Sequence, residues 1–443
     1  MKINESVWLK EVQISASDDN MAASFAEITL SWRARRAKPC KVPLTPGPLR
    51  LPILGNILNI PKHYLSQAQS HRCPQLVEDC DGLLEKRSSI YSDSLGLDWS
   101  AALMPYGNKW KLSRRMFQQQ VGRVDRNRAV QLREAHGFLV RLLQSPKEFL
   151  SHIHHMTGAA LLDVAYALNI QSREGHFARL AEDANNAVSK TANSGSSMRE
   201  VDVIVVKNIP SWMPGAGFKC KAASFRRTMT ALLEEPFVDV QRRIVHSGTH
   251  ISHTTLQTKL IYFAGSRRGY KLRPEYSQTQ TASTLTAFFL VMVLFPEVQV
   301  KAQKQLDSVL HGDRFPEMHD QPSLLNVSAG SLFSPLMMSM TVTSFQNFMI
   351  IANIRALSYD EADYPDPSAY RFIKDGKWNS YIPDPATAAF GFGRRMCPGR
   401  RFAQDQLWIT IVSVLASSII TKALDENGIA ITPDGEDLPG LIR

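Results

Sequence analysis

The stretch FGFGRRMCPGRRFAQ, from Phe390 to Gln404, places a single cysteine in a glycine-rich turn that leads into an apolar helix. Cysteine is usually a small buried hydrophobe, so glycines and arginines are unusual neighbours for it. At the N-terminal side of a helix, the helix dipole and the free N–H groups stabilise a thiolate. The setting of Cys397 therefore indicates a metal-binding thiolate, and a buried structural cysteine beside a helix start is the alternative.

The other residues of this stretch suit a flat, bulky ligand held against the sulfur. Gly391, Gly393 and Gly399 let the backbone approach such a ligand because they lack Cβ. Arg395 can pair with a carboxylate of the ligand through a charge-assisted hydrogen bond. Phe390 supplies an aromatic wall that keeps water from the sulfur. Together these features predict an axial cysteine ligand to haem iron.

The pattern Phe390-x-x-Gly393-x-Arg395-x-Cys397-x-Gly399 resembles the haem-binding signature of the cytochrome P450 superfamily, and neighbouring segments resemble its fungal microsomal haem-thiolate monooxygenases. The resemblance implies haem b (iron protoporphyrin IX) as cofactor, with Cys397 as its iron ligand. It also implies that one oxygen atom of O2 is inserted into a small, lipophilic organic substrate, as in fungal secondary metabolism.

The resemblance further implies an electron-transfer partner and a cellular location. The electrons would come from an NADPH-dependent reductase, since the chain has no dinucleotide-binding fingerprint of its own. The arginines around the haem loop, Arg394, Arg400 and Arg401, would dock that acidic partner. The family's location would be the cytosolic face of the endoplasmic reticulum membrane, whose surface would be a further partner.

The segment MPYGNKWKLSRRMF, residues 104–117, resembles the C helix of the family. Its W-x-x-x-R pattern falls on Trp110 and Arg114, which lie four residues apart and so on one face of a helix. The resemblance implies that both side chains, with Arg395, hold the haem propionates. The alternative is that Trp110 is a packing residue and Arg114 a surface residue, with no role in haem binding.

The oxygen-activating helix of the family, the I helix, is interrupted in this sequence. YFAGS ends at Ser266, QTASTLTAFFL resumes at Gln280, and residues 267–279 form a polar insertion. When the positions of the family motif are counted back from Phe288 and Phe289, its acidic position falls on Thr279 and its proton-relay threonine on Gln280. Thr281 carries the nearest hydroxyl group that could act as the catalytic proton relay. The alternative is that Thr281 is an ordinary helical threonine without a catalytic role.

Other family elements have no match in the sequence. No glutamate is followed three residues later by arginine, so the E-x-x-R pair of the K helix is absent and Arg371, which matches its arginine partner, lacks that support. Because these losses lie between well-matched blocks, we expect an incomplete or mis-spliced gene product. A catalytically defective haem-binding remnant is accordingly the second interpretation of function.

The amino-acid composition and net charge limit which other classes of function the chain could have. With 44% hydrophobic and 21% charged residues the chain is globular, and five scattered cysteines indicate a reducing compartment. The net charge of +10 indicates an acidic partner, an anionic membrane or nucleic acid. The basic residues form no zinc-finger, RNP or basic-zipper pattern, so we expect no nucleic acid partner. A basic helical protein that binds nucleic acid or a membrane surface is the third interpretation.

We expect a leader and basic flank over residues 1–45, without a clear transmembrane helix, followed by a single cytochrome P450-like haem domain over residues 46–443. Apolar residues at helical spacing predict helices over 128–168, 222–244, 281–310 and 400–420. Pro296 should divide the third of these ranges, and NFMIIANI, residues 347–354, is the best strand. The fold class is therefore mainly α with a minor β part.

The histidines of HIHH, His152, His154 and His155, form the one further group with metal-ligand chemistry. No acidic or cysteine ligand accompanies them in the sequence. A solvated helix face is therefore preferred over a metal site for these side chains.

Overall fold

The computed structural model describes residues 104, 106–121, 124–166, 168, 175–193, 217–246, 277–324, 340–345, 348–353, 373–374, 377–379, 381, 389–391 and 396–432. All of them fall in one compact unit, which spans 61–202 and 210–443. The predicted leader, 1–45, lies outside the described residues. What is described is mainly helical with two small antiparallel hairpins, so the predicted fold class is confirmed.

The described residues form eight α-helices. They are α5 (Asn108–Val121), α6 (Val124–Gln144), α7 (Phe149–Tyr166), α8 (His176–Asn193), α11 (Gly217–His246), α13 (Ser277–Leu294), α14 (Pro296–Leu310) and α18 (Arg400–Ser417). Two short 3₁₀ turns, η3 (Pro146–Glu148) and η4 (Met318–Ser323), follow α6 and α14. The helical range predicted over 128–168 is thus divided between two helices, because η3 separates α6 from α7.

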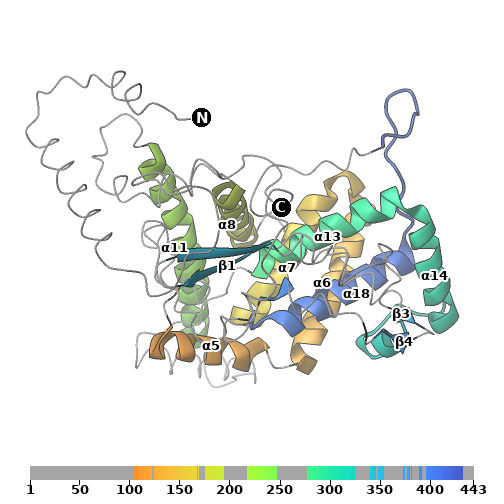
Figure 1. Cartoon of the computed structure of the whole chain (residues 1–443). Helices are drawn as coiled ribbons and strands as arrows, with labels where there is room; N and C mark the ends of the chain where they lie inside the picture. The colour runs from red at the N-terminus through yellow and green to blue at the C-terminus, as the bar shows by residue number, and fades with distance from the viewer. Residues whose placement is uncertain are drawn as a thin grey trace, which may run out of the picture. The chain divides into compact units, whose positions relative to one another are not determined.

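The main core lies where α18 packs against α6, α13 and α14 and where α7 packs against α6 and α13 (Figure 1). Its largest fully buried side chains include Phe138 of α6, Leu285 of α13 and Trp408 of α18. In α18 every residue from Leu407 to Leu415 is buried. A helix that is apolar nearly all round belongs at the centre of a fold, and α18 is there.

Pro296 ends one helix and begins the next, as predicted. Phe295 is the N-cap of α14, and Pro296 occupies the first helical position, where a missing N–H removes no hydrogen bond. Residues Gln280–Leu294 and Pro296–Leu310 meet at an angle of 105°. Across the described residues, no single helix has the length and apolar character of a membrane span, and only this bent pair has them jointly.

A second helical layer is made by α8 and α11, which pack on each other through Ala184, Phe225, Met229 and Leu233. Figure 1 shows the two helices in olive and green, α11 being the longer. The predicted helix over 222–244 is thus confirmed within a longer one. Pro236 lies inside α11 without ending it.

The described strands form two hairpins. β1 (Met340–Phe345) pairs antiparallel with β2 (Phe348–Asn353), with Val342 opposite Ile351, and β3 (Ile373–Lys374) pairs with β4 (Lys377–Trp378). β2 confirms the strand predicted over 347–354. β1 lies within residues 323–348, where the resemblance places the K helix, so this part of that segment is extended and not helical.

The prediction of a solvated histidine face on α7 is wrong. His152 and His155 are only 3% and 9% exposed, because α7 contacts α6, α13 and α8 and so has little free surface. The Nε2 atom of His152 lies 2.9 Å from Ser145 Oγ and 3.1 Å from the Ser145 carbonyl oxygen. Within the described residues no group of three potential ligands could hold a metal ion.

Candidate haem site

The cysteine of the signature lies in a closed loop three residues before the start of α18. The Cys397 N–H donates a hydrogen bond to the Phe390 carbonyl oxygen at 2.7 Å, and the Arg400 N–H donates to the Cys397 carbonyl oxygen at 3.4 Å. Gly391 is buried and has φ +76°, a conformation that favours glycine. The loop therefore turns back on itself and presents a half-buried thiol at the helix N-terminus.

Gly399 has a different role from Gly391. It is the N-cap of α18, with φ −91° and ψ 7°, which other residues can also adopt. Its backbone is buried, and its carbonyl oxygen accepts the Ala403 N–H at 2.9 Å. The backbone angles of Gly399 thus do not require a glycine, in contrast to the positive φ of Gly391.

α5 meets this loop through Arg114, one of the two residues that the sequence singled out on it. Arg114 Nη2 donates to the carbonyl oxygen of Met396, the residue before the cysteine, at 2.5 Å. The Arg114 guanidinium lies over the Trp110 ring at 5.4 Å, and Trp110 is buried. Two motifs 282 residues apart in the sequence therefore converge on one place. The alternative, in which Arg114 is only a surface residue, does not account for this contact.

α6 fixes the first turns of α18, and hence the position of the cysteine loop. The fully buried Gln131 donates from Nε2 to the Phe402 carbonyl oxygen at 2.7 Å. Arg128 Nε donates to Asp405 Oδ2 at 3.1 Å. Neither contact was predicted from the sequence. Gln131 lies four and seven residues before the buried Ala135 and Phe138, and this helical spacing places a polar residue on the buried face of α6.

An aromatic and a cationic side chain from either side of Cys397 in the sequence also meet. Phe390 is half buried, and the Arg400 guanidinium lies 5.6 Å from the centre of its ring. Arg401, the next residue, is exposed. Two arginines that the sequence treated alike as docking residues thus have different surroundings.

The first turns of α13 bear on the predicted proton relay. Ser277 to Thr279 belong to the helix, so it begins inside the predicted insertion. Thr281 is buried, with 7% exposure, whereas Gln280 is exposed. Of the two neighbouring positions, Thr281 is the one that faces the protein interior. Its catalytic role stays a prediction.

Several predicted residues lie outside the described part of the chain. They include Gly393, Arg394 and Arg395 of the haem loop, Arg371, and 267–276 of the insertion. Their roles stay predictions.

The chain is similar to known proteins. The family model for cytochrome P450 matches residues 346–417, which include β2, the cysteine loop and α18. Cytochrome P450 monooxygenase ple1 of Rhodocybe pseudopiperita is 32% identical, over 94% of this chain and 90% of the relative. The chain belongs to the cytochrome P450 family. It is accordingly a haem-dependent monooxygenase by family, which the sequence had predicted from the cysteine signature.

Further relatives of this cytochrome P450 are also fungal. Cytochrome P450 monooxygenase COX2 of Coprinopsis cinerea is 30% identical, over 86% of this chain and 84% of the relative. Tryptamine 4-monooxygenase of Psilocybe cyanescens is 27% identical, over 93% and 92%. The alignment with ple1 spans 486 positions, more than the 443 residues of this chain, so parts of that relative have no counterpart here. This agrees with the family elements that we found absent from the sequence.

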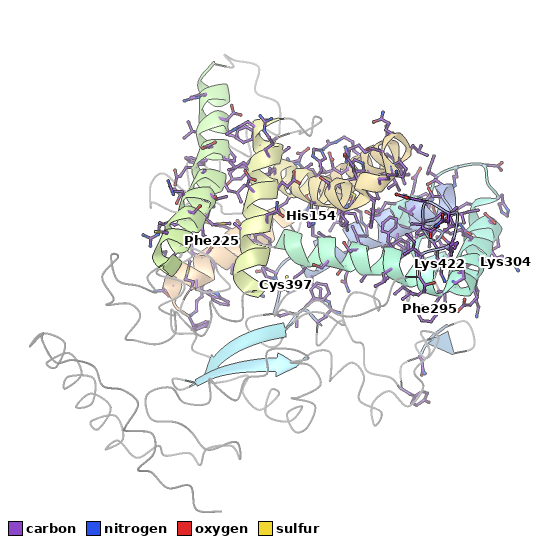
Figure 2. All side chains as sticks on the ribbon, turned by 90° about the horizontal axis from the view of Figure 1, so that it is seen from above. His154, Phe225, Phe295, Lys304, Cys397 and Lys422 are labelled. Carbon is purple, nitrogen blue, oxygen red and sulfur yellow. The ribbon has the colours of Figure 1, made fainter. Side chains whose placement is uncertain are left out.

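The described residues fit a haem. A thiol at a helix N-terminus can bind iron as thiolate, a ring lies beside the loop, and a guanidinium reaches the loop from α5. Figure 2 places Cys397 far across the molecule from Lys304 and Lys422, so the site lies at one end of α18 and not near α14.

Proposed function

We propose that Cys397 is the iron ligand of this cytochrome P450, and that the enzyme oxygenates a small, lipophilic organic molecule with electrons from an NADPH-dependent reductase. The contact between Arg114 and the Met396 carbonyl oxygen carries this proposal, because it joins the predicted C helix to the cysteine loop. When bound, haem supplies oxygen activation at iron, and a thiolate ligand donates the electron density that favours O–O cleavage.

The residues of the chain have distinct roles in this proposal. The Cys397 thiolate binds iron, and Phe390 with the glycines Gly393 and Gly399 shapes the loop around it. Trp110 and Arg114, together with Arg395, bind the propionates. The hydrogen bond of Arg114 to the loop, and its position over the Trp110 ring, support this assignment.

Thr281 is the residue that we propose would hold and donate a proton in the reaction. It is buried in the second turn of α13, which packs against α18. The adjacent Gln280 is exposed, and burial therefore favours Thr281 of the two. Proton delivery by a positioned side chain is a common catalytic device.

The reductase is proposed to dock on the outer surface of α5 and the start of α18. α5 carries Lys109, Lys111 and Arg115, all exposed, and its sequence contains no acidic residue. Arg401 adds a further exposed cation next to the cysteine loop. Such a surface attracts an acidic partner, and salt weakens the attraction by screening. By family resemblance, the proposed location is the cytosolic face of the endoplasmic reticulum membrane.

The carbon monoxide difference spectrum of the reduced protein tests the ligand. We expect the thiolate-type spectrum in the wild-type chain, its loss in Cys397→Ser, and its retention in Cys220→Ser, which replaces an exposed cysteine on α11. A thiolate-type spectrum that persists in Cys397→Ser overturns the assignment. A chain that binds haem but forms no product is the defective remnant. A chain without haem that binds nucleic acid or anionic vesicles in a salt-dependent way is the basic binding protein.

Charge reversal tests the docking surface. Lys111→Glu with Arg115→Glu should slow reductase-supported haem reduction several-fold at low salt, and the difference from wild type should shrink as ionic strength rises. Lys304→Glu is the matched control, because Lys304 is an exposed lysine at the far end of the molecule from Cys397 (Figure 2). Equal slowing by both variants contradicts a docking surface on α5.

A further inference from the structure

Gln131 on α6 places an amide group inside the main core. The residue is fully buried, and its Nε2 atom donates to the Phe402 carbonyl oxygen of α18 at 2.7 Å. Its Oε1 atom is also buried and has no hydrogen-bond partner within the described residues. An amide in such surroundings costs free energy that an apolar side chain of the same size would not. Packing alone therefore does not account for a glutamine at this position.

The Phe402 carbonyl group does not need this amide as a partner. It lies in the first turn of α18, where a carbonyl group accepts the N–H group four residues later. The last carbonyl groups of a helix lack such a partner, and at that end of α18 Gln303 donates to the carbonyl oxygens of Leu415 and Ser418. The hydrogen bond from Gln131 thus adds direction to a group that the helix itself already satisfies.

Direction matters for α18 because apolar packing specifies its position along its own axis only weakly. Every residue from Leu407 to Leu415 is buried, and most of the side chains in the surrounding core are apolar. Apolar burial is non-directional, and the ridges and grooves of side chains repeat along a helix. Cys397 precedes the first residue of α18 by three positions. A shift or rotation of the helix therefore moves the cysteine.

Two contacts from α6 provide the direction that apolar packing lacks. Gln131 reaches Phe402, and Arg128 Nε donates to Asp405 Oδ2 at 3.1 Å. The two α6 residues lie three positions apart, as do their partners on α18, and they pair in opposite order, as neighbouring turns of antiparallel helices do. Two such points fix both the axial position and the rotation of α18. Arg128 is partly exposed, so Gln131 is the contact that water weakens less.

We propose that Gln131 is a positioning residue for haem binding, which fixes the axial position and rotation of α18 and thereby places Cys397. The proposal rests on the assignment of Cys397 as the iron ligand for its effect on haem, whereas the effect on the cysteine loop does not need haem. A packing residue would lower the stability of the core when it is replaced. An apolar replacement of Gln131 should instead loosen the loop and leave the core at least as stable, because no group on α18 loses its only partner.

Amide hydrogen exchange measures the loop and the core together, in the purified full chain with saturating haem and without it. In Gln131→Met, the N–H groups of Cys397 and Ala403, which are hydrogen-bonded in the loop and in the first turn, should exchange about threefold to tenfold faster, the equivalent of one hydrogen bond. The N–H groups of residues 407–415 report on the core and should keep their wild-type protection. Faster exchange in both segments, or in neither, overturns the proposal.

Haem affinity tests the consequence for the site. Transfer of haem to an apoglobin should show an affinity about 10-fold weaker in Gln131→Met, as when a group that supports a metal ligand is removed. Gln406→Met is the matched control, because Gln406 is an equally buried amide on α18 whose Nε2 atom contacts the side chains of Met156 and Thr410. This control should retain wild-type affinity. Equal losses in the two variants would show that any buried amide of this core has the same effect, and the proposal fails.

The outcomes separate this proposal from the ligand assignment. If Cys397→Ser keeps the thiolate-type carbon monoxide spectrum, the ligand assignment fails, and exchange in the haem-free chain still decides whether Gln131 positions the loop. If thiolate ligation is present and Gln131→Met binds haem as tightly as wild type, Gln131 is not a positioning residue. Gln131→Leu, a second apolar replacement, should reproduce the results of Gln131→Met. Loss of core protection in both variants means that Gln131 acts by packing, which contradicts the proposal.

Discussion

The two ends of α18 are held by different chemistry. At its N-terminal end most of the contacts come from arginines: Arg114 on the Met396 carbonyl oxygen, Arg400 on the Phe390 ring, and Arg128 on Asp405. One neutral amide there, Gln131, donates to the Phe402 carbonyl oxygen. At its C-terminal end the contacts come from neutral amides of α14. Gln303 Nε2 lies 3.0 Å from the carbonyl oxygens of both Leu415 and Ser418. Gln299, which is buried, accepts the Ile420 N–H at 2.8 Å and donates to the Ile420 carbonyl oxygen at 3.0 Å.

This difference follows from what each end must do. The last carbonyl groups of a helix have no partner within it, and a neutral amide satisfies them without bringing a charge into the fold. The N-terminal end adjoins the cysteine that we propose as the iron ligand. A guanidinium held there can bind a carboxylate of the haem, whereas a cation at the far end would be too distant. Substitutions at the two ends should therefore affect different properties.

The largest effect on stability is expected at the C-terminal end. Gln299→Leu leaves the N–H and C=O groups of Ile420 without the Gln299 amide, and each such loss costs about 1–3 kcal/mol. We expect the free energy of unfolding to fall by about 2–3 kcal/mol in urea titrations, with the carbon monoxide spectrum of the folded protein unchanged. Lys304→Gln, on the exposed face of α14, is the control. A changed carbon monoxide spectrum in Gln299→Leu would contradict the view that the C-terminal end of α18 affects stability and not the haem site.

At the N-terminal end, Arg114→Leu should act on haem and less on folding. It removes the hydrogen bond to Met396 and the contact with Trp110, and by the proposal one propionate contact. Haem affinity should fall about 10–100-fold, the usual range when a group that supports a metal ligand is removed. Transfer of haem to an apoglobin measures this. Arg115→Leu, the exposed neighbour, should retain wild-type affinity. Equal losses in both variants would contradict the assigned role.

The ion pair between Arg128 and Asp405 should be intermediate, because its side chains are 30% and 10% exposed. Pairs at the surface contribute about 0–1 kcal/mol, and breaking buried ones costs more. A double-mutant cycle with Arg128→Gln and Asp405→Asn should give a coupling energy of about 1 kcal/mol in unfolding. A coupling energy near zero would mean that α6 positions α18 through Gln131 and apolar packing alone.

The smallest effect concerns pH at a site away from both ends. Burial lowers the pKa of His154 below its usual value, and the nearby Glu182 opposes this in part. The unfolded chain therefore takes up this proton more readily than the folded one, so folding stability should decrease as pH falls below about 6.5. His154→Gln should flatten that part of the stability profile. If the slope of folding stability against pH between pH 7 and 5 is unchanged in His154→Gln, His154 does not cause the pH dependence.

Short-range patterns predicted most helices and the cysteine motif from the sequence. Spacing of three and four residues indicated α6, α7, α11, α13 and α18, because a helix repeats every 3.6 residues whatever surrounds it. Pro296 divided α13 from α14 through its own covalent geometry. The Phe390 to Gly399 signature identified the family, which the fungal relatives confirm.

Tertiary packing decided which side chains of those helices act on one another. His152 and His155 are buried because three other helices cover α7, and spacing within α7 contains no information about its neighbours. The sequence likewise could not separate Arg400 from Arg401, since a helix points consecutive side chains in directions about 100° apart but the sequence does not show what lies in each direction. Arg114 reaches Met396 across 282 residues. A contact of that kind depends on how whole helices pack, and packing is a property of shape and volume summed over the core rather than of any one motif.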